Sequence, residues 1–228
     1  MSLSLPEGDG PLLRERLRTA RLYFVCDARP AADLERLLRA ALTGGADIVQ
    51  LREKELGRME IERAAQTFRR VADTYSALFI VNDDPELARS CDADGVHVGQ
   101  DDISAEQARE TLGPDAIVGF STHSEEQIAA SAVRPVDYIS VGPIWETPTK
   151  EGRPAVGLDL VRHAAQNAPH PFFAIGGIDP ANAGEVVAAG AQRLCAVRAI
   201  RDAADPQAAA AALRQAFAGA ERGVAPGG

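Results

Sequence analysis

Apolar runs of strand length recur along this chain, and each is followed by an Ala- and Leu-rich stretch whose apolar residues repeat with a helical period. The hydrophobic pattern therefore predicts a repeated βα unit. The eight predicted strands are Leu22–Cys26, Asp47–Leu51, Leu78–Asn82, Gly95–Val98, Ala116–Phe120, Tyr138–Val141, Phe172–Ile175 and Leu194–Val197.

The stretch between the first two predicted strands has a clear helical period. Its apolar residues fall at spacings that place them on one face of a helix, and they are Leu34, Leu37, Leu38, Ala41 and Leu42. That face is expected to pack against the strands.

Eight βα units without a break in composition favour one closed (β/α)8 barrel, the TIM barrel, over an open doubly wound sheet. The chain has 228 residues, about the length on which one such barrel closes. We expect a flexible N-terminus over 1–10, a short helix around 12–19, one barrel domain over 11–221 and a flexible tail over 222–228. The active site of such a barrel forms at the C-terminal ends of the strands, so the polar residues after each strand are the candidates for chemistry.

The composition narrows the classes of partner. Hydrophobic residues make up 46% and charged residues 25% of the chain, which is typical of a globular protein. The net charge of −9 and the lack of a basic run argue against a nucleic-acid partner. No stretch approaches the roughly 20 apolar residues that cross a bilayer, and no signal peptide is apparent, so we expect a cytoplasmic protein without a membrane partner. The cysteines, Cys26, Cys91 and Cys195, form no CxxC pair, which fits a reducing compartment.

The second predicted strand runs into the sequence QLREK, residues 50–54. The period of two along a strand puts Gln50, Arg52 and Lys54 on one face. Barrel interiors usually hold branched apolar residues, so this face is better explained as an anion-binding site than as a solvated strand end. The guanidinium of Arg52 and the ammonium of Lys54 both suit phosphate oxygens.

Two aspartates after the third and fourth strands have no evident structural role. Asp84 precedes Pro85 and is explained as the N-cap of the next helix, which leaves Asp83. Ser104 is likewise explained as a cap, which leaves Asp102. Each carboxylate alone would be an ordinary loop residue. Together, on neighbouring loops that face a cationic strand end, they predict a Mg²⁺ site that holds a diphosphate.

The fifth strand leads to Ser121, Thr122 and His123, which are expected at the mouth of the barrel, where hydroxyls could donate to phosphate. A general-base role for His123 is less favoured, because no Ser or Cys nucleophile with a carboxylate partner is evident. His97, within the fourth strand, is interpreted as structural.

The loops after the last three strands provide further candidates. The connection over 142–154 is longer than a usual βα loop and is predicted to be a lid, with the core Thr147-Pro148-Thr149-Lys150. Barrels often bind a phosphate between the seventh and eighth loops, where glycine lets backbone N–H groups approach. The glycine pair Gly176-Gly177 and the dipeptide Val197-Arg198 therefore predict a second phosphate site. A tight turn is the alternative explanation for the two glycines.

Taken in order, these motifs resemble those of the thiamine phosphate synthase family: QLREK at 50–54, ND at 82–83, DGVHVGQDD at 94–102, GFSTHS at 119–124, DYISVGPIWETPTK at 137–150, AIGGI at 174–178 and AVRAI at 196–200. The resemblance spans nearly the whole predicted barrel. It implies a transferase of thiamine biosynthesis. The substrates would be 4-amino-5-hydroxymethyl-2-methylpyrimidine diphosphate and a thiazole phosphate, and their coupling would form thiamine phosphate and release diphosphate.

The resemblance also implies a role for each matching residue. Asp83 and Asp102 would hold Mg²⁺, and catalysis would depend on the cations Arg52, Lys54 and Lys150. The residues implied for the pyrimidine diphosphate are Gln50, Arg52, Lys54, Asn82, Ser121 and Lys150. Those implied for the thiazole phosphate are Thr147, Thr149, Gly177, Val197 and Arg198, and Leu51, Glu53 and Pro148 are expected as further substrate-binding residues.

Two positions depart from the family pattern. Asp84 stands where the family often has arginine, and Arg198 stands where a serine commonly contacts the thiazole phosphate. Two alternative functions remain, a paralogous barrel that isomerises the thiazole phosphate and a non-catalytic phosphate-binding barrel, and neither would need the predicted diphosphate site. The number of subunits stays open, a homo-oligomer included.

Overall fold

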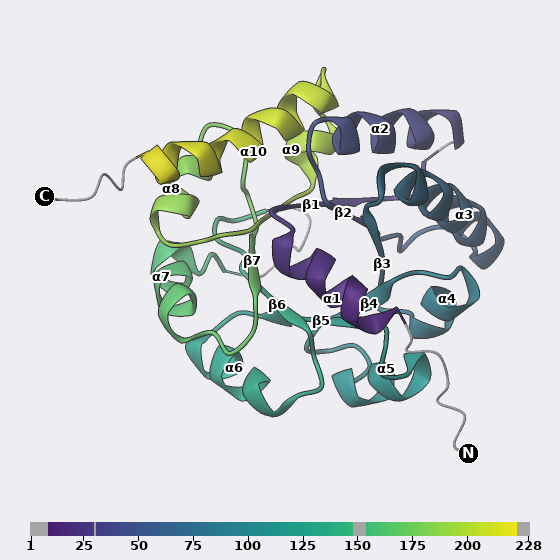
Figure 1. Cartoon of the computed structure of the whole chain (residues 1–228), viewed down its shortest axis with the longest axis horizontal. Coiled ribbons are helices and arrows are strands. Elements are labelled where there is room, and N and C mark those ends of the chain that lie inside the picture. The colour runs from purple at the N-terminus through teal and green to yellow at the C-terminus, as the bar shows by residue number, and fades with distance from the viewer. Residues whose placement is uncertain (1–8, 30, 148–153, 223–228) are drawn as a thin grey trace, which may run out of the picture.

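The computed structural model describes residues 9–29, 31–147 and 154–222 of the chain. Within them, eight parallel strands form a closed barrel in the order of the sequence, and β8 pairs with β1 (Figure 1). The strands are β1 (Leu22–Cys26), β2 (Ile48–Leu51), β3 (Leu78–Asn82), β4 (Gly95–Val98), β5 (Ile117–Thr122), β6 (Tyr138–Val141), β7 (Phe172–Ile175) and β8 (Leu194–Ala196). The predicted (β/α)8 barrel is confirmed, although β2 and β5 each begin one residue later than expected.

Helices surround the barrel, and the last of them, α10, packs beside α2 (Figure 1). The helices of the described residues are α1 (Gly10–Thr19), α2 (Ala31–Thr43), α3 (Arg58–Tyr75), α4 (Pro85–Ser90), α5 (Ala105–Leu112), α6 (Glu125–Ala130), the 3-10 helix η1 (Ser131–Val133), α7 (Gly157–Asn167), α8 (Ala183–Ala188), α9 (Arg198–Arg201) and α10 (Pro206–Arg222). The predicted face of α2 is buried, as its leucines at 34, 37, 38 and 42 are at most 6% exposed.

The short helix α1 lies across one end of the barrel instead of along its side (Figure 1). Its Leu17 belongs to the same buried cluster as Ile48, Leu78 and Ile117, the first residues of β2, β3 and β5. Helix α1 therefore closes the N-terminal end of the barrel and leaves the C-terminal end open to a ligand.

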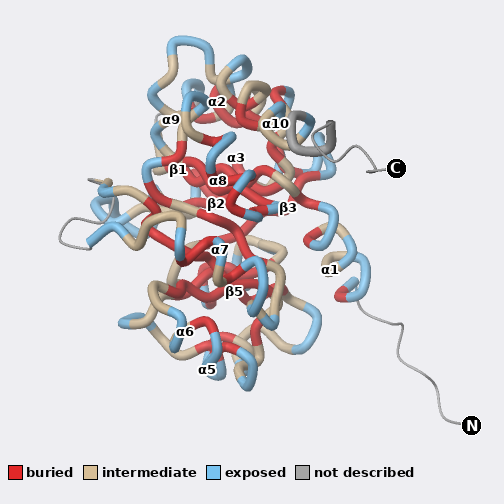
Figure 2. The backbone as a smooth tube through the Cα atoms, turned by 90° about the vertical axis from the view of Figure 1, so that its left-hand side faces the viewer, coloured by how far each residue is buried: buried red, intermediate tan, exposed pale blue. Residues whose placement is uncertain are grey.

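The apolar core has two layers, and almost every strand residue is buried in one of them (Figure 2). The inner layer fills the barrel and includes Tyr23, Val25 and Ile80. The outer layer lies between strands and helices and includes the alternate residues, such as Phe24 and Phe79. This alternation follows from the period of two along each strand. It decides which residues can face a ligand inside the barrel.

Two strand ends differ from the prediction in ways that affect the site. β5 continues through Ser121 and Thr122, because both residues pair with β6. β8 ends at Ala196, because the backbone of Val197 leaves the strand conformation and caps α9. Polar residues expected in a loop after β5 are thus fixed within the barrel wall.

The predicted flexible ends, residues 1–10 and 222–228, lie for the most part outside the described residues. Helix α1 begins at Gly10 and α10 ends at Arg222. Among the described helices, none has the length and apolar character needed to cross a membrane.

Candidate active site

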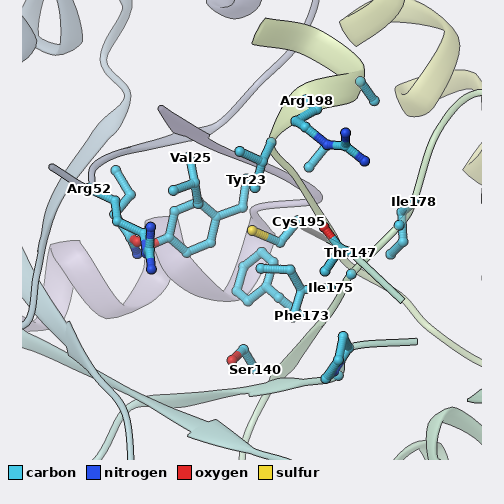
Figure 3. Close-up of a pocket in the computed structure, with 18 of the residues that line it drawn as sticks. Tyr23, Val25, Arg52, Ser140, Thr147, Phe173, Ile175, Ile178, Cys195 and Arg198 are labelled. Atoms are coloured by element: carbon cyan, nitrogen blue, oxygen red, sulfur yellow. The ribbon is translucent and has the colours of Figure 1, made fainter. Parts of the chain in front are cut away.

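A cavity of about 390 Å³ opens at the C-terminal ends of the strands. Side chains from several strands point into it (Figure 3). Among the predicted site residues, those that line the cavity are Gln50, Arg52, Asn82, Ser121, Thr147, Gly177, Val197 and Arg198. They belong to segments far apart in the sequence, so closure of the barrel is what brings them together.

Two arginines face the cavity from opposite sides, Arg52 after β2 and Arg198 at the start of α9 (Figure 3). In the part of the chain that the structure describes, neither guanidinium forms an ion pair, although Asp202, whose pKa is lowered mainly by Arg201 and in part by Arg198, also lines the cavity. A guanidinium binds phosphate oxygens through paired N–H donors. The cavity therefore offers a cation to an anionic group on each side.

Two carboxylates, Asp83 and Asp102, interact beside the cavity on the loops after β3 and β4, and they are called the acid pair below. The Nζ of Lys54 lies 3.2 Å from the Oδ2 of Asp83. Burial, followed by the neighbouring carboxylate of Asp102, raises the pKa of Asp83, and Lys54 offsets only part of this effect. None of the three lines the cavity, but Lys54 lies two residues after Arg52 and Asp83 directly follows Asn82, and both Arg52 and Asn82 do, so the acid pair and Lys54 are called the rim of the cavity below.

The acid pair fits a divalent cation that is shared with a ligand. Among the described residues, no group of three or more His, Cys, Asp or Glu side chains could enclose a metal ion. Mg²⁺ commonly takes one or two carboxylates and completes its shell with water and phosphate oxygens. Two carboxylates only partly compensated by a lysine therefore match the donor set of a magnesium diphosphate.

The interpretation of Asp102 as a residue without a structural role was wrong. Its Oδ2 accepts a hydrogen bond from the backbone N–H of Gly99 at 2.8 Å, which holds the loop after β4. Asp84, in contrast, caps α4 as predicted, because its Oδ1 accepts from the N–H of Leu87 at 2.8 Å. The Oδ2 of Asp84 pairs with Arg58 at 2.7 Å, so this charge is compensated by a guanidinium.

The prediction that Gln50, Arg52 and Lys54 share one strand face was wrong, because β2 ends at Leu51. Gln50 is buried inside the barrel and Arg52 reaches the cavity, as expected from the strand period. Lys54 lies outside the cavity lining, beyond the end of the strand, and contacts Asp83 instead. The predicted cluster of three polar side chains is therefore divided between the cavity and its rim.

The two remaining residues of this segment have structural contacts. Leu51 packs in the outer apolar layer, so its side chain faces away from the cavity. The carboxylate of Glu53 accepts hydrogen bonds from the backbone N–H groups of Ala28, Lys54 and Glu55. Glu53 thus holds the loop, and a substrate contact by Leu51 or Glu53 stays a prediction.

Ser121 and Thr122 face opposite sides of the barrel wall. Ser121 lines the cavity, whereas Thr122 is fully buried and donates a hydrogen bond to the carbonyl of Ser140 at 2.9 Å. The expectation that Thr122 lies at the mouth was wrong, because β5 is longer than predicted. His123 lines the cavity, and its Nδ1 contacts the carbonyl of Gly142.

The two glycines after β7 are required by close packing against the loop after β6. A Cβ on Gly176 would lie 2.5 Å from the Cα of Pro143, and one on Gly177 would lie 2.8 Å from the Cβ of Trp145. Both glycines also have positive φ, 106° and 68°, which L side chains rarely adopt. The tight-turn explanation therefore holds, and Gly177 in addition lines the cavity.

The predicted lid, residues 142–154, is described only in part. Pro148, Thr149 and Lys150 lie outside the described residues. Thr147 lines the cavity, and Trp145 packs against the outer apolar layer.

The floor of the cavity is polar, which was not predicted from the sequence. His97, interpreted as structural, lines the cavity together with Tyr23 and Ser140, and Tyr138 is fully buried. Burial raises the pKa of both Tyr23 and Tyr138, so both remain phenols. The strand period could have found these residues, because they occupy inward positions in a barrel that otherwise favours branched apolar side chains.

The cavity therefore combines cations on two sides, an acid pair at the rim and an uncharged polar floor. Such a site suits group transfer between two phosphate-bearing molecules, in which positioning and charge stabilisation carry the reaction.

Comparisons with known proteins agree with this geometry. Residues 22–200 match the family model described as thiamine monophosphate synthase. The chain is 47% identical over 219 residues to the thiamine-phosphate synthase of Saccharopolyspora erythraea, covering 92% of this chain and 98% of that protein. It is 49% identical over 200 residues to the thiamine-phosphate synthase of Streptomyces avermitilis, covering 86% and 93%. Among solved structures, thiamine phosphate pyrophosphorylase from Pyrococcus furiosus matches with a TM-score of 0.80 and 32% identity, covering 91% of this chain and 98% of that one.

Proposed function

The chain belongs to the thiamine monophosphate synthase family, and on this premise we propose a role for each part of its active site. It is a transferase of thiamine biosynthesis that moves the 4-amino-2-methylpyrimidinylmethyl group from its diphosphate to a thiazole phosphate, forming thiamine phosphate and releasing diphosphate. The observation that carries this conclusion is the match to synthases over nearly the whole barrel. A paralogue that only isomerises the thiazole phosphate would have no use for the acid pair.

We propose that Asp83 and Asp102 hold Mg²⁺ together with the diphosphate. The support is the placement of two carboxylates together on neighbouring loops with Lys54 at 3.2 Å from Asp83, and the raised pKa of Asp83, caused by burial and then by Asp102, agrees with it. When bound, the ion would supply Lewis-acid stabilisation of the charge on the diphosphate oxygens.

The diphosphate itself is assigned to three cations, Arg52, Lys54 and Lys150. Arg52 supports this role because it lines the cavity without a carboxylate partner among the described residues. Lys54 supports it because its contact with Asp83 holds it next to the acid pair. Lys150 lies outside the described residues, so its role rests on the family motif alone.

The pyrimidine ring is assigned to the inner part of the cavity, where Gln50, Asn82 and Ser121 face inward. Their side chains are uncharged and can donate and accept hydrogen bonds. An uncharged surface suits a ring that becomes cationic during the reaction, because no fixed positive charge opposes it there.

The thiazole phosphate is assigned to the opposite side, near Gly177, Val197 and Arg198, with Thr147, Pro148 and Thr149 from the loop after β6. Arg198 supports this assignment because it faces the cavity across from Arg52 (Figure 3). Two separated cations allow the two phosphate groups to be held apart while the rings meet between them.

The reaction needs no nucleophilic residue of the protein. The electron-rich aminopyrimidine stabilises a methylene cation, so the C–O bond to the diphosphate can break before the thiazole nitrogen forms the new C–N bond. Arg52, Lys54 and Lys150 stabilise the charge that develops on the leaving diphosphate. The floor and the second phosphate site hold the rings in contact, which supplies the entropic part of the rate gain.

Removal of the metal tests this assignment. With both substrates and Mg²⁺, the purified protein should release diphosphate and form thiamine phosphate, and excess chelator should stop both. Addition of Mg²⁺ beyond the chelator should restore the rate, and chelator already saturated with Mg²⁺ is the control. Turnover that continues in excess chelator would remove the metal from the proposal while leaving the family assignment intact.

A further inference from the structure

Five side chains form one hydrogen-bonded chain across the floor of the cavity, from β2 to β5, and it is called the floor chain below. Gln50 Nε2 donates to Tyr23 Oη at 2.5 Å, and Tyr23 Oη lies 3.0 Å from Tyr138 Oη. Tyr138 Oη lies 3.0 Å from His97 Nδ1, and His97 Nε2 lies 3.0 Å from Ser121 Oγ. The floor chain thus passes through β1, β6 and β4 between its two ends.

One assignment of hydrogens gives each group of the floor chain a partner. A phenol has a single hydrogen, and in this assignment Tyr23, which accepts from Gln50, uses it to donate to Tyr138. Tyr138 then donates to Nδ1 of His97. A neutral imidazole that accepts at Nδ1 has its hydrogen on Nε2, so His97 donates to Ser121. Every group of the floor chain therefore points its hydrogen the same way.

Four members of the floor chain line the cavity, but only its two ends keep a hydrogen-bonding atom that the floor chain itself does not use. In this assignment Ser121 accepts from His97 and, at 3.5 Å, from Ser140, which leaves its own hydrogen for an acceptor in the cavity. The amide nitrogen of Gln50 is used inside the chain, which leaves its oxygen as an acceptor for the cavity. Both ends line the cavity, whereas Tyr138 is fully buried and does not line it. Tyr138 can act on a ligand only through its neighbours.

The barrel makes specific room for this central residue. Gly119 lies directly opposite Tyr138 in the β5–β6 ladder. A Cβ on Gly119 would lie 2.1 Å from Cζ of Tyr138, so any other residue there would displace the phenol. The glycine of the segment 119–124 thus has a role that a turn does not explain, because it lies within a strand.

We propose that the floor chain makes the site selective for an aminopyrimidine ring, with Tyr138 and His97 as the positioning residues that transmit the constraint. The inference rests on the proposed binding of the pyrimidine by Gln50 and Ser121. An aminopyrimidine offers an amino N–H, which the oxygen of Gln50 accepts, and a ring nitrogen, to which Ser121 donates. An oxo-pyrimidine has a carbonyl and a ring N–H in these places. Its binding requires all five groups of the floor chain to reverse together.

The test is the selectivity between two substrates. The kcat/KM for the 4-aminopyrimidine diphosphate is divided by that for the matching 4-oxo compound, with the thiazole phosphate held constant. In Tyr138→Phe, which keeps the ring and removes the hydroxyl, this ratio should fall about tenfold or more, because each end can then reverse alone. His97→Leu interrupts the floor chain at a second position and should give the same loss.

Thr122→Val is the matched control. It removes a fully buried hydroxyl of β5 next to Ser121, yet this hydroxyl bonds to a backbone carbonyl on the other side of the barrel wall. Its ratio should equal that of the unaltered protein. Circular dichroism and thermal unfolding identify which variants are folded, and an unchanged ratio in a folded Tyr138→Phe or His97→Leu overturns the inference.

Two further variants separate failure of this inference from failure of the proposed binding site. Gln50→Ala and Ser121→Ala remove the ends that would contact the ring. If they leave the ratio unchanged, the pyrimidine does not bind where proposed, and the inference is lost with it. If they lower the ratio while Tyr138→Phe and His97→Leu do not, the binding site stands and the inference alone is wrong.

Discussion

The rim and the floor of the active-site cavity recognise a ligand by different means. The rim is charged and lies on loops, and the side chains of Lys54 and Asp83 are 54% and 26% exposed. The floor chain is uncharged and lies on strands, and its residues are at most 8% exposed. A charge buried without full compensation is costly, whereas a neutral dipole can be buried at low cost when each donor finds an acceptor. The charged groups therefore lie at the rim, where solvent or a ligand can compensate them. The neutral groups inside the barrel recognise the shape and the hydrogen-bonding pattern of the ligand.

The two regions should also differ in the sign of their effect on stability. The acid pair keeps two carboxylates together, and the raised pKa of Asp83 means that its charge opposes folding. The floor chain is fully hydrogen-bonded along its length, so removal of a member leaves a buried partner unsatisfied. The rim is thus expected to contribute to activity at a cost in stability, and the floor to contribute to both.

The largest expected effect is a loss of kcat/KM when a charge is removed from the rim. Lys54→Ala and Asp102→Ala should each lower kcat/KM on the order of 10²-fold, as the loss of one preorganised charge commonly does, with the fold intact. Asp102→Asn keeps an acceptor for the N–H of Gly99 and should lose as much. Steady-state kinetics and circular dichroism measure the two properties.

Asp84→Asn is the control for these rim variants. It removes a charge next to Asp83, but asparagine also caps helices, and the native carboxylate is directed to Arg58. Its rate should stay close to that of the unaltered protein. If Lys54→Ala or both Asp102 variants retain full activity, the residue concerned does not contribute to catalysis as proposed.

A smaller effect is expected on KM, and it tests whether Arg198 binds phosphate through its side chain. Arg198→Ala should raise KM for the thiazole phosphate about tenfold, roughly the value of one charge-assisted hydrogen bond, and leave KM for the pyrimidine diphosphate unchanged. Arg52→Ala on the opposite side should give the reverse pattern. If Arg198→Ala changes neither KM, only the backbone at this position remains a candidate for phosphate contact.

The smallest expected effect is on stability, and it tests whether the charge of Asp83 destabilises the folded protein. At neutral pH and without Mg²⁺, Asp83→Asn should raise the midpoint of thermal unfolding by about 2–4 °C at most, the shift of a 1 kcal/mol change in a chain of this length. The reason is that a raised pKa makes ionised Asp83 less stable in the folded than in the unfolded chain. The gain should shrink as the pH falls through the raised pKa, and it should vanish below the ordinary value of 3.8, where both states are protonated. A lower midpoint for Asp83→Asn at neutral pH would contradict this account of the rim.

Much of the rim could be predicted because its residues are identified by position along the chain. Asp83 follows β3 and Asp102 follows β4, and the capping roles of Asp84 and Ser104 are local patterns of a few residues. The error at Asp102 is of the same local kind, since its bond to Gly99 spans only three positions but has no residue pattern that identifies it. The error at Thr122 arose because the end of β5 depends on pairing with β6 and not on its own residues.

The sequence by itself determined the repeated βα unit, the closed barrel and the polar residues at the strand ends, because the hydrophobic period is a property of each segment alone. Only the tertiary structure decided which inward side chains meet. The floor chain joins residues of five strands, and the contact between Tyr23 and Tyr138 links positions 115 residues apart. Such contacts depend on the register of all eight strands and on closure of the barrel, which no single segment encodes. His97 therefore appears as an ordinary strand residue in the sequence, and its place between Tyr138 and Ser121 follows only once β4, β5 and β6 lie side by side.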